Sequence, residues 1–501
     1  MPRFICLSLA LALPTAALAS TVSFSTHAAQ CSSNLCTLTS LYHADLNGDG
    51  LEDLVAVDGP NYGNFRVTFN QGNGSFSAPV NYALPIISSA HPDEVGAFIT
   101  GDFSHHGSID LAVFGFDSGN LYIYTNNGKG AFTPTKTLQF SSSGGNYGHI
   151  SAVQADFNRD NNPDIAFTID TQLHIWLGDG KGGFAPSLSQ SVQGNTLATG
   201  DFDGDGKADL LISGDQASLS SAYAYYGDGT GHFPVWNTVN LPGGYTVFSV
   251  GDVNSDGRSD IIASGNAAFP KAVKVFYGNA TNRAFPSRTT IPVGGCISQA
   301  GVAIADLDGN GYNDLIVTET PCSNGDPTYV EVLTRNPNSS YNPPQILYTV
   351  PDPASGVNQV FGVPLVLHSD RNSKPDLLFQ QCLGKYCADG VSTITLLNTT
   401  AGNFPTCEAP AAAEGISVCS PPATTGSTTV TFNLGAAMPT AARNMNVWVD
   451  GKKVAEQIDG FSNYTYLTKS VSLSLGNHQV TVYAAGWDQS TIRKSFTVNV
   501  Q

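Results

Sequence analysis

A chain of 501 residues with 41% hydrophobic and only 12% charged residues can bury a large core and has room for more than one domain. Its formal net charge of −18 argues against nucleic acid and anionic lipid as partners, because both require a basic surface. The 52 glycines, together with many Ser, Thr and Asn residues, favour short strands joined by turns over long helices.

Residues 1–19 have the pattern of a secretory signal peptide. An apolar run from Phe4 to Leu13 is followed by a small-residue cleavage site that ends at Ala19. The run is too short to span a bilayer, and no later stretch reaches the roughly 20 apolar residues that a span requires. We therefore expect a protein that is secreted or held at the cell surface, without membrane insertion.

Eight of the nine cysteines lie beyond this signal. An even number of cysteines in an exported chain predicts disulfide bonds, with some free thiols as the alternative. Eight cysteines allow 105 pairings, so the sequence does not fix the connectivity. Pairing between near neighbours is our hypothesis: Cys31–Cys36, Cys296–Cys322, Cys382–Cys387 and Cys407–Cys419.

A motif rich in Asp, Asn and Gly recurs along the chain. Its clearest copy, Asp201-Phe-Asp-Gly-Asp-Gly-Lys-Ala-Asp-Leu, has Asp at positions 1, 3, 5 and 9 and Gly at position 6. Copies begin at residues 45, 102, 156, 201, 252, 306 and 368, with a mean period of about 54 residues that indicates a repeat architecture. We number these loops one to seven.

A second motif repeats with the same count. A Gly-rich turn ends in an aromatic residue 28 to 36 residues after each loop begins; these residues are Phe76, Phe132, Phe184, Phe233, Phe285, Tyr341 and Phe404. Each repeat reads as four short strands, which is typical of a propeller blade. We predict an all-β protein with a seven-bladed β-propeller over residues 20–409.

The segment before loop one suggests how the ring closes. Ser20–Ala28 contains Phe24 in a Ser-Phe-Ser context like that of Phe76. We expect this segment to form the outer strand of the seventh blade, which would join the two ends of the ring and leave no free sheet edge there.

The loops also have the ligand pattern of a calcium site. Carboxylate or amide oxygens at positions 1, 3, 5 and 9, with a backbone carbonyl at position 7, supply several of the six to eight oxygens that Ca²⁺ takes. Closely packed carboxylates repel each other unless a cation is present. Mg²⁺ fits less well because it requires strict octahedral geometry. Ordinary Asx-rich turns are the alternative, but five well-formed copies in register favour a metal.

We predict about five Ca²⁺ sites, in loops one, three, four, five and six. Their ligands are Asp45, Asn47, Asp49, Asp53, Asp156, Asn158, Asp160, Asp164, Asp201, Asp203, Asp205, Asp209, Asp252, Asn254, Asp256, Asp260, Asp306, Asp308, Asn310 and Asp314. Loop two carries Ser104 and His106 at ligand positions, and loop seven begins with His368. Because imidazole is a poor ligand for Ca²⁺, we leave both loops out. An EF-hand is excluded, since position 12 is Ala56 in loop one and Ile212 in loop four, not Glu.

The stretches 198–210 and 250–257 resemble FG-GAP/VCBS repeats, which form the calcium-bearing blades of integrin-α-like propellers. The resemblance extends over residues 20–409 and implies that the metal loops and the Gly turns share one face of the ring. The other face would then carry the longer loops and the ligand. Tyr147, Tyr245 and Tyr386 lie in loops of that face, where stacking on sugars is one interpretation and ordinary loop packing the other.

The composition changes after Phe404. Residues 410–427 are rich in Pro, Ala, Thr and Ser, which predicts a linker. Residues 428–501 alternate as strands do, with Asp450-Gly451 as a hairpin signal and Trp448 expected in the core. They resemble a bacterial Ig-like domain, and we expect a small β-sandwich.

The chain carries no G-x-S-x-G, H-E-x-x-H or P-loop motif. We expect a monomeric, non-catalytic binding or adhesion module for an extracellular glycan or protein. The alternative is a calcium-dependent extracellular enzyme, a lyase or hydrolase that degrades polysaccharides, since a propeller scaffold does not decide function.

Overall fold

The computed structural model describes residues 22–501 apart from 31–40, 50, 58–62, 89–90, 141–149, 170, 215–220, 242–244, 255, 266–271, 280–282, 287, 295–300, 311, 320–327, 337, 351–358, 371–373, 384–389, 401–414, 422, 427, 439–441, 459–463 and 487–490. Every regular element in these described ranges is a β-strand. In the same ranges, no helix has the length and apolarity needed to cross a membrane.

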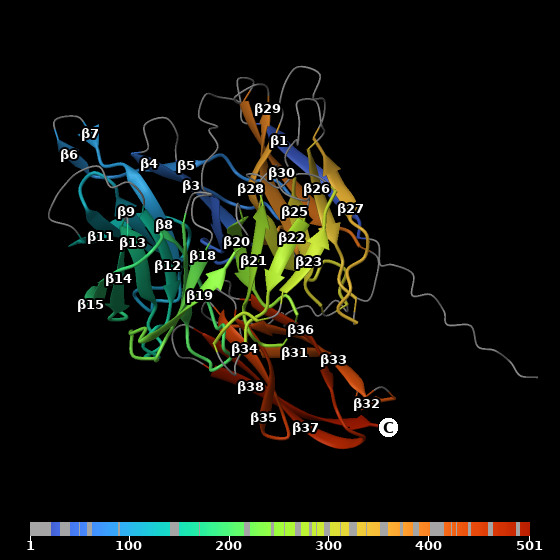
Figure 1. Cartoon of the computed structure of the whole chain (residues 1–501). Coiled ribbons are helices and arrows are strands. Elements are labelled where there is room, and N and C mark those ends of the chain that lie inside the picture. Colours follow the sequence, from blue (N-terminus) through green and yellow to red (C-terminus); the bar gives the residue numbers. More distant parts are fainter. Residues whose placement is uncertain are drawn as a thin grey trace, which may run out of the picture.

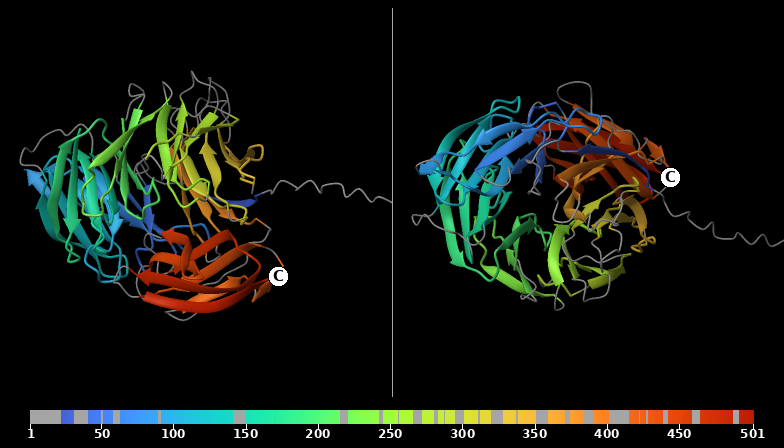
Figure 2. Two further views of the ribbon diagram at one scale, coloured as in Figure 1. Left: turned by 60° about the horizontal axis from the view of Figure 1, so that its bottom comes forward. Right: turned by 90° about the horizontal axis from the view of Figure 1, so that it is seen from above.

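Seven four-stranded antiparallel sheets, the blades, stand around a common centre (Figure 2). Blades one to six follow chain order: β2 (Leu41–Ala44), β3 (Asp53–Val57), β4 (Asn64–Thr68), β5 (Val80–Ala83); β8 (Val95–Gly101), β9 (Asp110–Gly115), β10 (Asn120–Asn126), β11 (Phe132–Gln139); β12 (Ile150–Ala155), β13 (Asp164–Ile169), β14 (Gln172–Gly178), β15 (Phe184–Ser191); β16 (Thr196–Gly200), β17 (Asp209–Ser213), β18 (Ser221–Tyr226), β19 (Val235–Asn240); β20 (Tyr245–Gly251), β21 (Asp260–Gly265), β22 (Ala272–Phe276), β23 (Arg288–Pro292); β24 (Val302–Ala305), β25 (Asp314–Thr318), β26 (Tyr329–Leu333), β27 (Gln345–Thr349). A short hairpin of β6 (Ile86–Ser88) and β7 (His91–Pro92) lies between blades one and two. The predicted all-β propeller is confirmed.

The seventh blade combines the two ends of this region. Its sheet has the order β1-β30-β29-β28, with β28 (Gln359–Leu367), β29 (Asp376–Leu383), β30 (Gly390–Asn398) and β1 (Phe24–Gln30). Strand β1 is antiparallel to β30, from the Phe24–Asn398 pair to the Gln30–Ser392 pair. The prediction that the segment before loop one forms the outer strand of this blade is confirmed.

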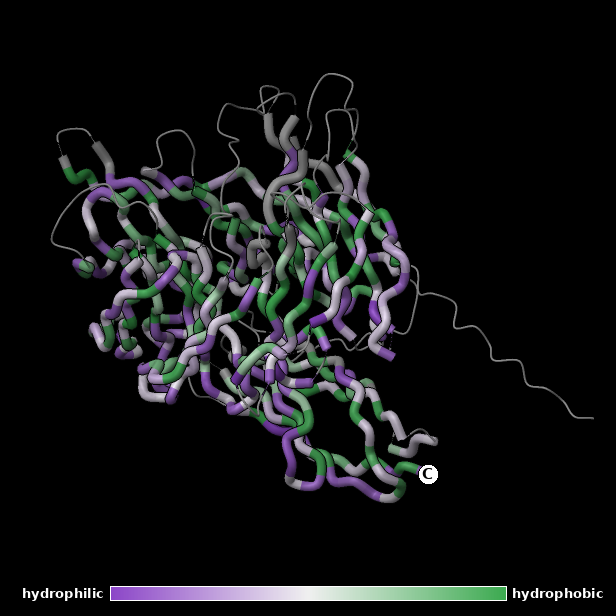
Figure 3. The backbone as a smooth tube through the Cα atoms, viewed as in Figure 1, coloured by the Kyte–Doolittle hydropathy of each residue, from purple (hydrophilic) through white to green (hydrophobic). Residues whose placement is uncertain are grey.

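The second strand of a blade is more deeply buried than its outer strand. The second strands β9, β13, β17 and β25 are buried along their whole length, because both of their faces meet neighbouring blades. The outer strand β11 is exposed or half-buried at every residue after Phe132, and the two classes alternate from Thr135 to Gln139. Hydrophobic and hydrophilic residues accordingly alternate along many strands (Figure 3), which is the period of two expected for half-buried strands.

The two repeated motifs meet across the blade boundaries. In loops two, three and four, the aromatic residue at position 2 packs on the Gly-turn aromatic residue of the next blade. The ring centroids are 5.4 Å apart for Phe103 and Phe184 and 5.7 Å apart for Phe157 and Phe233. Both motifs therefore recur with one period because they form the same interface between consecutive blades.

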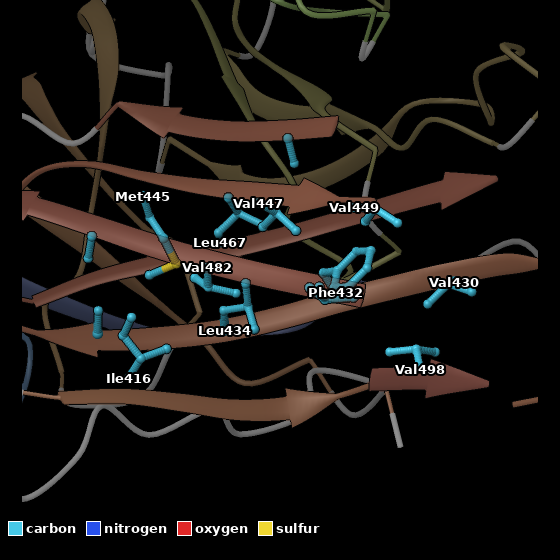
Figure 4. Packing of buried hydrophobic residues seen from close by; sticks show 14 of the residues in the cluster. Ile416, Val430, Phe432, Leu434, Met445, Val447, Val449, Leu467, Val482 and Val498 are labelled. Atoms are coloured by element: carbon cyan, nitrogen blue, oxygen red, sulfur yellow. The ribbon is translucent and has the colours of Figure 1, made fainter. Parts of the chain in front are cut away.

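A second, smaller domain follows the ring and lies below it in Figure 1. It has a three-stranded sheet of β31 (Gly415–Ser420), β33 (Thr429–Ala437) and β36 (Tyr464–Ser472). The other sheet has five strands: β32 (Thr424–Thr425), β38 (Thr491–Val500), β37 (Gly476–Gly486), β34 (Ala442–Val449) and β35 (Lys452–Ile458). Phe432, Leu434, Met445 and Val482 are part of one fully buried cluster between these strands (Figure 4).

Two expectations about this domain are corrected. The stretch 410–427 is not all linker, because β31 pairs with β33 along Gly415–Ser420. Trp448 is partly exposed rather than in the core, since it alternates along β34 with the buried Val447 and Val449. The hairpin signal is confirmed: Asp450 and Gly451 both have positive φ, 51° and 80°, between β34 and β35, as a tight two-residue turn requires.

Candidate metal centre

Each acidic loop joins the first strand of a blade to the second, and its side chains fold back onto its own backbone. In loop four, Asp201 Oδ2 accepts a hydrogen bond from the Gly206 amide at 2.8 Å, and its Oδ1 accepts one from the Asp205 amide at 3.2 Å. Asp203 Oδ1 also accepts from the Asp205 amide, at 3.1 Å. Gly206 has a φ of +79°, a left-handed conformation that a Cβ would disfavour. Backbone amides of the loop thus hold the carboxylates at positions 1 and 3 in place.

The other predicted loops are built in the same way. In loop one, Asp45 accepts from the Gly48 amide at 2.8 Å, and Asn47 accepts from the Asp49 amide at 2.9 Å. Corresponding bonds to position 1 exist in loops three, five and six, from Asn161, Gly257 and Gly309. A common hydrogen-bond pattern therefore presets the same arrangement of side-chain oxygens in all five loops.

The carboxylate at position 9 fastens the loop to the rest of its blade. Asp209 Oδ2 accepts from the Phe202 amide at 2.9 Å, and its Oδ1 accepts from the Gly227 amide at 2.8 Å. The same pair of backbone bonds is made by Asp53, Asp164, Asp260, Asp314 and Asp376. Position 9 is conserved across these repeats for this structural reason as well as for any metal.

In two loops, carboxylates from three ligand positions converge. One oxygen from each of Asp201, Asp203 and Asp209 lies within 4.8 Å of the others, and Asp306, Asp308 and Asp314 form an equivalent group in loop six. Burial, with the charges of Asp203 and Asp201, raises the pKa of Asp209 to about 7. A bound divalent cation would remove this cost, so the donor set fits Ca²⁺.

In loops four and five, the carboxylate at position 5 pairs with a basic residue. Asp205 Oδ2 lies 2.6 Å from Nζ of Lys207, and Asp256 pairs with Arg258. Arg283, from the connection between β22 and β23 of the next blade, lies 2.7 Å from Asp203 Oδ2 through its Nε atom and covers the ring of Tyr226. The repeat pattern did not indicate Arg283, because it belongs to a different repeat.

Every loop is also bonded to the blade that follows it. Asn126 donates to the Leu46 carbonyl at 2.7 Å, Gly231 to the Phe157 carbonyl at 3.0 Å, and Asn313 to the Asp252 carbonyl at 2.7 Å. Ser259 and Asn398 make equivalent bonds to loops four and six. An ion held in a loop would therefore also stiffen the contact between two blades.

The C-terminal domain approaches loop five. The charges of Asp252 and Asp256 act on Lys469 of β36, whose pKa is nevertheless lowered by burial. In return, Lys469 moderates the rise in the pKa of Asp252 that burial causes. The smaller domain thus places a cation beside the predicted ligands of one blade.

Loop seven differs from the predicted sites, as expected from its sequence. His368 at its first position donates its backbone amide to Glu52 of blade one at 2.7 Å. Asp376 keeps the role of position 9. Residues 371–373 of this loop lie outside the described residues.

The residues predicted for the opposite face fall largely outside the described residues. Tyr147, Tyr386 and most of the cysteines lie outside the described residues, and the side chains of Tyr245 and Cys382 do as well. A carboxyl pair that the repeats did not indicate lies in blade six. Glu319 and Glu331 are 1% and 2% exposed. Burial and the charge of Glu319 raise the pKa of Glu331 to about 8.

The FG-GAP-like repeat matches the chain over residues 45–113, 102–167, 156–212, 201–263 and 252–317. Together these stretches span more than half of the chain. The chain belongs to the FG-GAP-like repeat family. Each matched FG-GAP-like stretch runs from one acidic loop through the next loop into the strand that follows it, so the family's repeat crosses the blade boundary described above.

Integrin alpha-PS5 of Drosophila melanogaster is a relative of this FG-GAP-like chain. It is 27% identical over 175 residues, which are 31% of this chain and 17% of the integrin. The chain thus matches under one fifth of that relative's length.

Two solved structures are weakly similar. An Agrocybe aegerita lectin that recognises non-reducing terminal N-acetylglucosamine has 20% identity and a TM-score of 0.49, over 73% of this chain and 87% of the lectin. BBS1N in complex with ARL6DN has 13% identity and a TM-score of 0.46, over 75% and 98%. Neither similarity is strong enough to carry an argument.

Proposed function

We propose that this FG-GAP-like protein is a secreted, calcium-stabilised propeller that acts as a non-catalytic binding or adhesion module for an extracellular glycan or protein. The observation that carries the calcium proposal is the common loop geometry, in which backbone amides preset carboxylate and amide oxygens. The ligands would be the twenty side chains at positions 1, 3, 5 and 9 of loops one, three, four, five and six.

Bound Ca²⁺ would supply positive charge and coordination bonds to these oxygens. The chain's own residues supply the other contacts that hold each loop. Position 1 closes the loop on its own backbone, position 9 ties it to its blade, and the next blade donates a hydrogen bond to it. Calcium in this arrangement has a structural role, and the ligand would bind elsewhere on the ring.

An extracellular role is supported by the integrin relative and by the pattern of a signal peptide at residues 1–19. The four neighbouring cysteine pairs and a monomeric state belong to the same proposal. The strongly negative charge favours a neutral or basic ligand over nucleic acid.

The binding proposal is tested on an extracellular glycan array and a panel of matrix proteins, with and without chelator. A parallel assay measures reducing sugars and unsaturated products from the glycans that bind. Saturable binding without product supports the module. Product released over many turnovers would contradict it and would favour the polysaccharide-degrading enzyme.

A further inference from the structure

Loop two departs from the calcium pattern, and the structure shows what replaces it. Position 5 is His106, whose ring lies between the carboxylates of Asp102 and Asp110. His106 Nδ1 is 3.0 Å from Asp102 Oδ1, and Nε2 is 3.5 Å from Asp110 Oδ1. Both aspartates are fully buried, whereas the imidazole is one-third exposed. The ring thus lies among the acidic side chains that frame the loop.

Both nitrogens of this ring face acceptors. Nε2 is 2.7 Å from the backbone carbonyl of Asn126, which can only accept a hydrogen bond. Nδ1 faces Asp102, whose two oxygens already accept backbone amides from His106 at 3.0 Å and from Gly107 at 2.8 Å. Both oxygens of Asp102 act as acceptors here, which is the role of a carboxylate group. Both ring nitrogens must therefore donate, and a doubly donating imidazole carries a positive charge.

Ser104, at position 3, completes the arrangement. Its hydroxyl donates to Asp110 Oδ2 at 2.8 Å, and its oxygen lies 3.1 Å from His106 Nδ1. Asp110 Oδ1 also accepts from the Asn126 amide at 2.9 Å. The imidazole and both carboxylates of loop two thus have hydrogen-bond partners within the chain.

We propose that the imidazolium of His106 is the built-in cation of loop two and takes the place that a metal ion would have in the other loops. Loop two itself would then not require calcium. The pKa values of the position-9 carboxylates agree with a positive charge on His106. Burial raises the pKa of Asp110 only to about 6, because the charge of His106 is among the factors that lower it, whereas burial raises the pKa of Asp53 to about 8 and that of Asp164 to about 7.

This substitution makes blade two sensitive to alkaline pH. Among the described residues, the charged groups that face the imidazole are Asp102, from the loop, and Asp110, from β9. Strand β10 contributes the Asn126 carbonyl. The hydrogen bond to Asp102 is the main cause that raises the pKa of His106 to about 9. Because the folded-state pKa is raised, the stabilisation is complete below the unfolded pKa of about 6.5 and is lost as the pH rises through about 9.

The test compares wild type with H106Q, which keeps hydrogen bonding but removes the charge. Melting is followed at pH 6.5 and pH 10, in EDTA, so that the result does not depend on whether the other loops bind calcium. We expect H106Q to melt lower by about 2 °C or more at pH 6.5 and to approach wild type at pH 10. H232Q, the same substitution at an exposed histidine, is the control and should show no such change.

A second variant covers the case in which H106Q does not fold. H106K keeps a positive charge at pH 6.5 and largely keeps it at pH 9.5, so it should fold and lose less stability than wild type between these values. An H106Q destabilisation that is equal at both pH values, or absent, would overturn the proposal. Native mass spectrometry with Ca²⁺ or Zn²⁺ gives an independent result: if H106Q binds one ion fewer than wild type, His106 is a metal ligand and the proposal is wrong.

Discussion

Glu52 in loop one accepts a hydrogen bond from the backbone amide of His368 in loop seven, with 2.7 Å between Oε2 and N. Its Oε1 lies 3.3 Å from Nδ1 of His43. Burial favours the neutral acid, but the charge of His43 and the hydrogen bonds from His368 and His43 outweigh it and lower the pKa of Glu52. The Glu52 carboxylate, at position 8 of loop one, thus joins the first blade to the last. Ser259 and Asn313 occupy position 8 of loops five and six, and each donates a hydrogen bond to the loop of the preceding blade.

The first prediction concerns this contact and its pH dependence. A lowered folded-state pKa means that ionised Glu52 stabilises the ring above its unfolded pKa of about 4.3, and that this contribution is lost as the pH falls. We expect E52Q to reduce the free energy of unfolding by about 1–2 kcal/mol at pH 7 and by less at pH 3. Urea denaturation at both pH values measures this. E456Q, which removes a partly exposed partner of Lys453, should have little effect, and equal losses for E52Q at both pH values would count against the account.

The second prediction concerns the N-terminal strand. Deletion of residues 24–30 removes β1 from its seven-residue pairing with β30 and leaves an unpaired edge on blade seven. We expect a lower melting temperature and broader, less cooperative unfolding in calorimetry. A deletion that left both the melting temperature and the width of the transition unchanged would show that β1 does not hold the ring closed.

The third prediction concerns the packing between blades. Phe233 is buried at 6% exposure and its ring centroid is 5.7 Å from that of Phe157 in the preceding blade. We expect F233A to cost about 3–5 kcal/mol of stability in urea denaturation, as large-to-small core substitutions do. H232A changes the adjacent exposed residue and is the matched control. If the two variants were equally stable, the two repeated motifs would not form the interface described here.

The fourth prediction concerns competition for loop four. Arg283 is paired with Asp203, a predicted calcium ligand. R283Q removes a positive charge from the site, so we expect tighter calcium binding by this loop in isothermal titration calorimetry. R288Q, at an exposed position of β23, makes the same change in net charge at a distance and should leave the affinity unchanged. Weaker binding by R283Q would mean that Arg283 supports the site rather than competing for it.

Much of the fold could be predicted because the repeat is local. Loop ligands, Gly turns and strand alternation all lie within one repeat, and even β1 carried a signal in its Ser-Phe-Ser context. The contacts that escaped prediction cross from one repeat to another. Arg283 reaches loop four from the next blade, and Glu52 contacts loop seven where the first and last blades meet, 316 residues away in sequence. Sequence spacing contains no information about such pairs.

The stretch 410–427 and loop two show a second reason why some features could not be predicted from the sequence. Strand β31 lies within a stretch, 410–427, whose Pro, Ala, Thr and Ser content is typical of a linker, and its pairing with β33 decides its structure. His106 is a poor calcium ligand by its chemistry, but its charge state depends on the Asn126 carbonyl and Asp102. These partners become visible only once β10 and the loop are placed together.

The most direct test of the account is to count calcium ions and measure their effect on stability in one protein preparation. Native mass spectrometry should find about five Ca²⁺ ions per chain, and EDTA should lower the melting temperature in calorimetry. The variant D201N/D203N should bind one ion fewer and retain a smaller response to EDTA. A wild-type chain that binds no Ca²⁺ and melts at the same temperature with and without EDTA would contradict the proposal that calcium braces this ring.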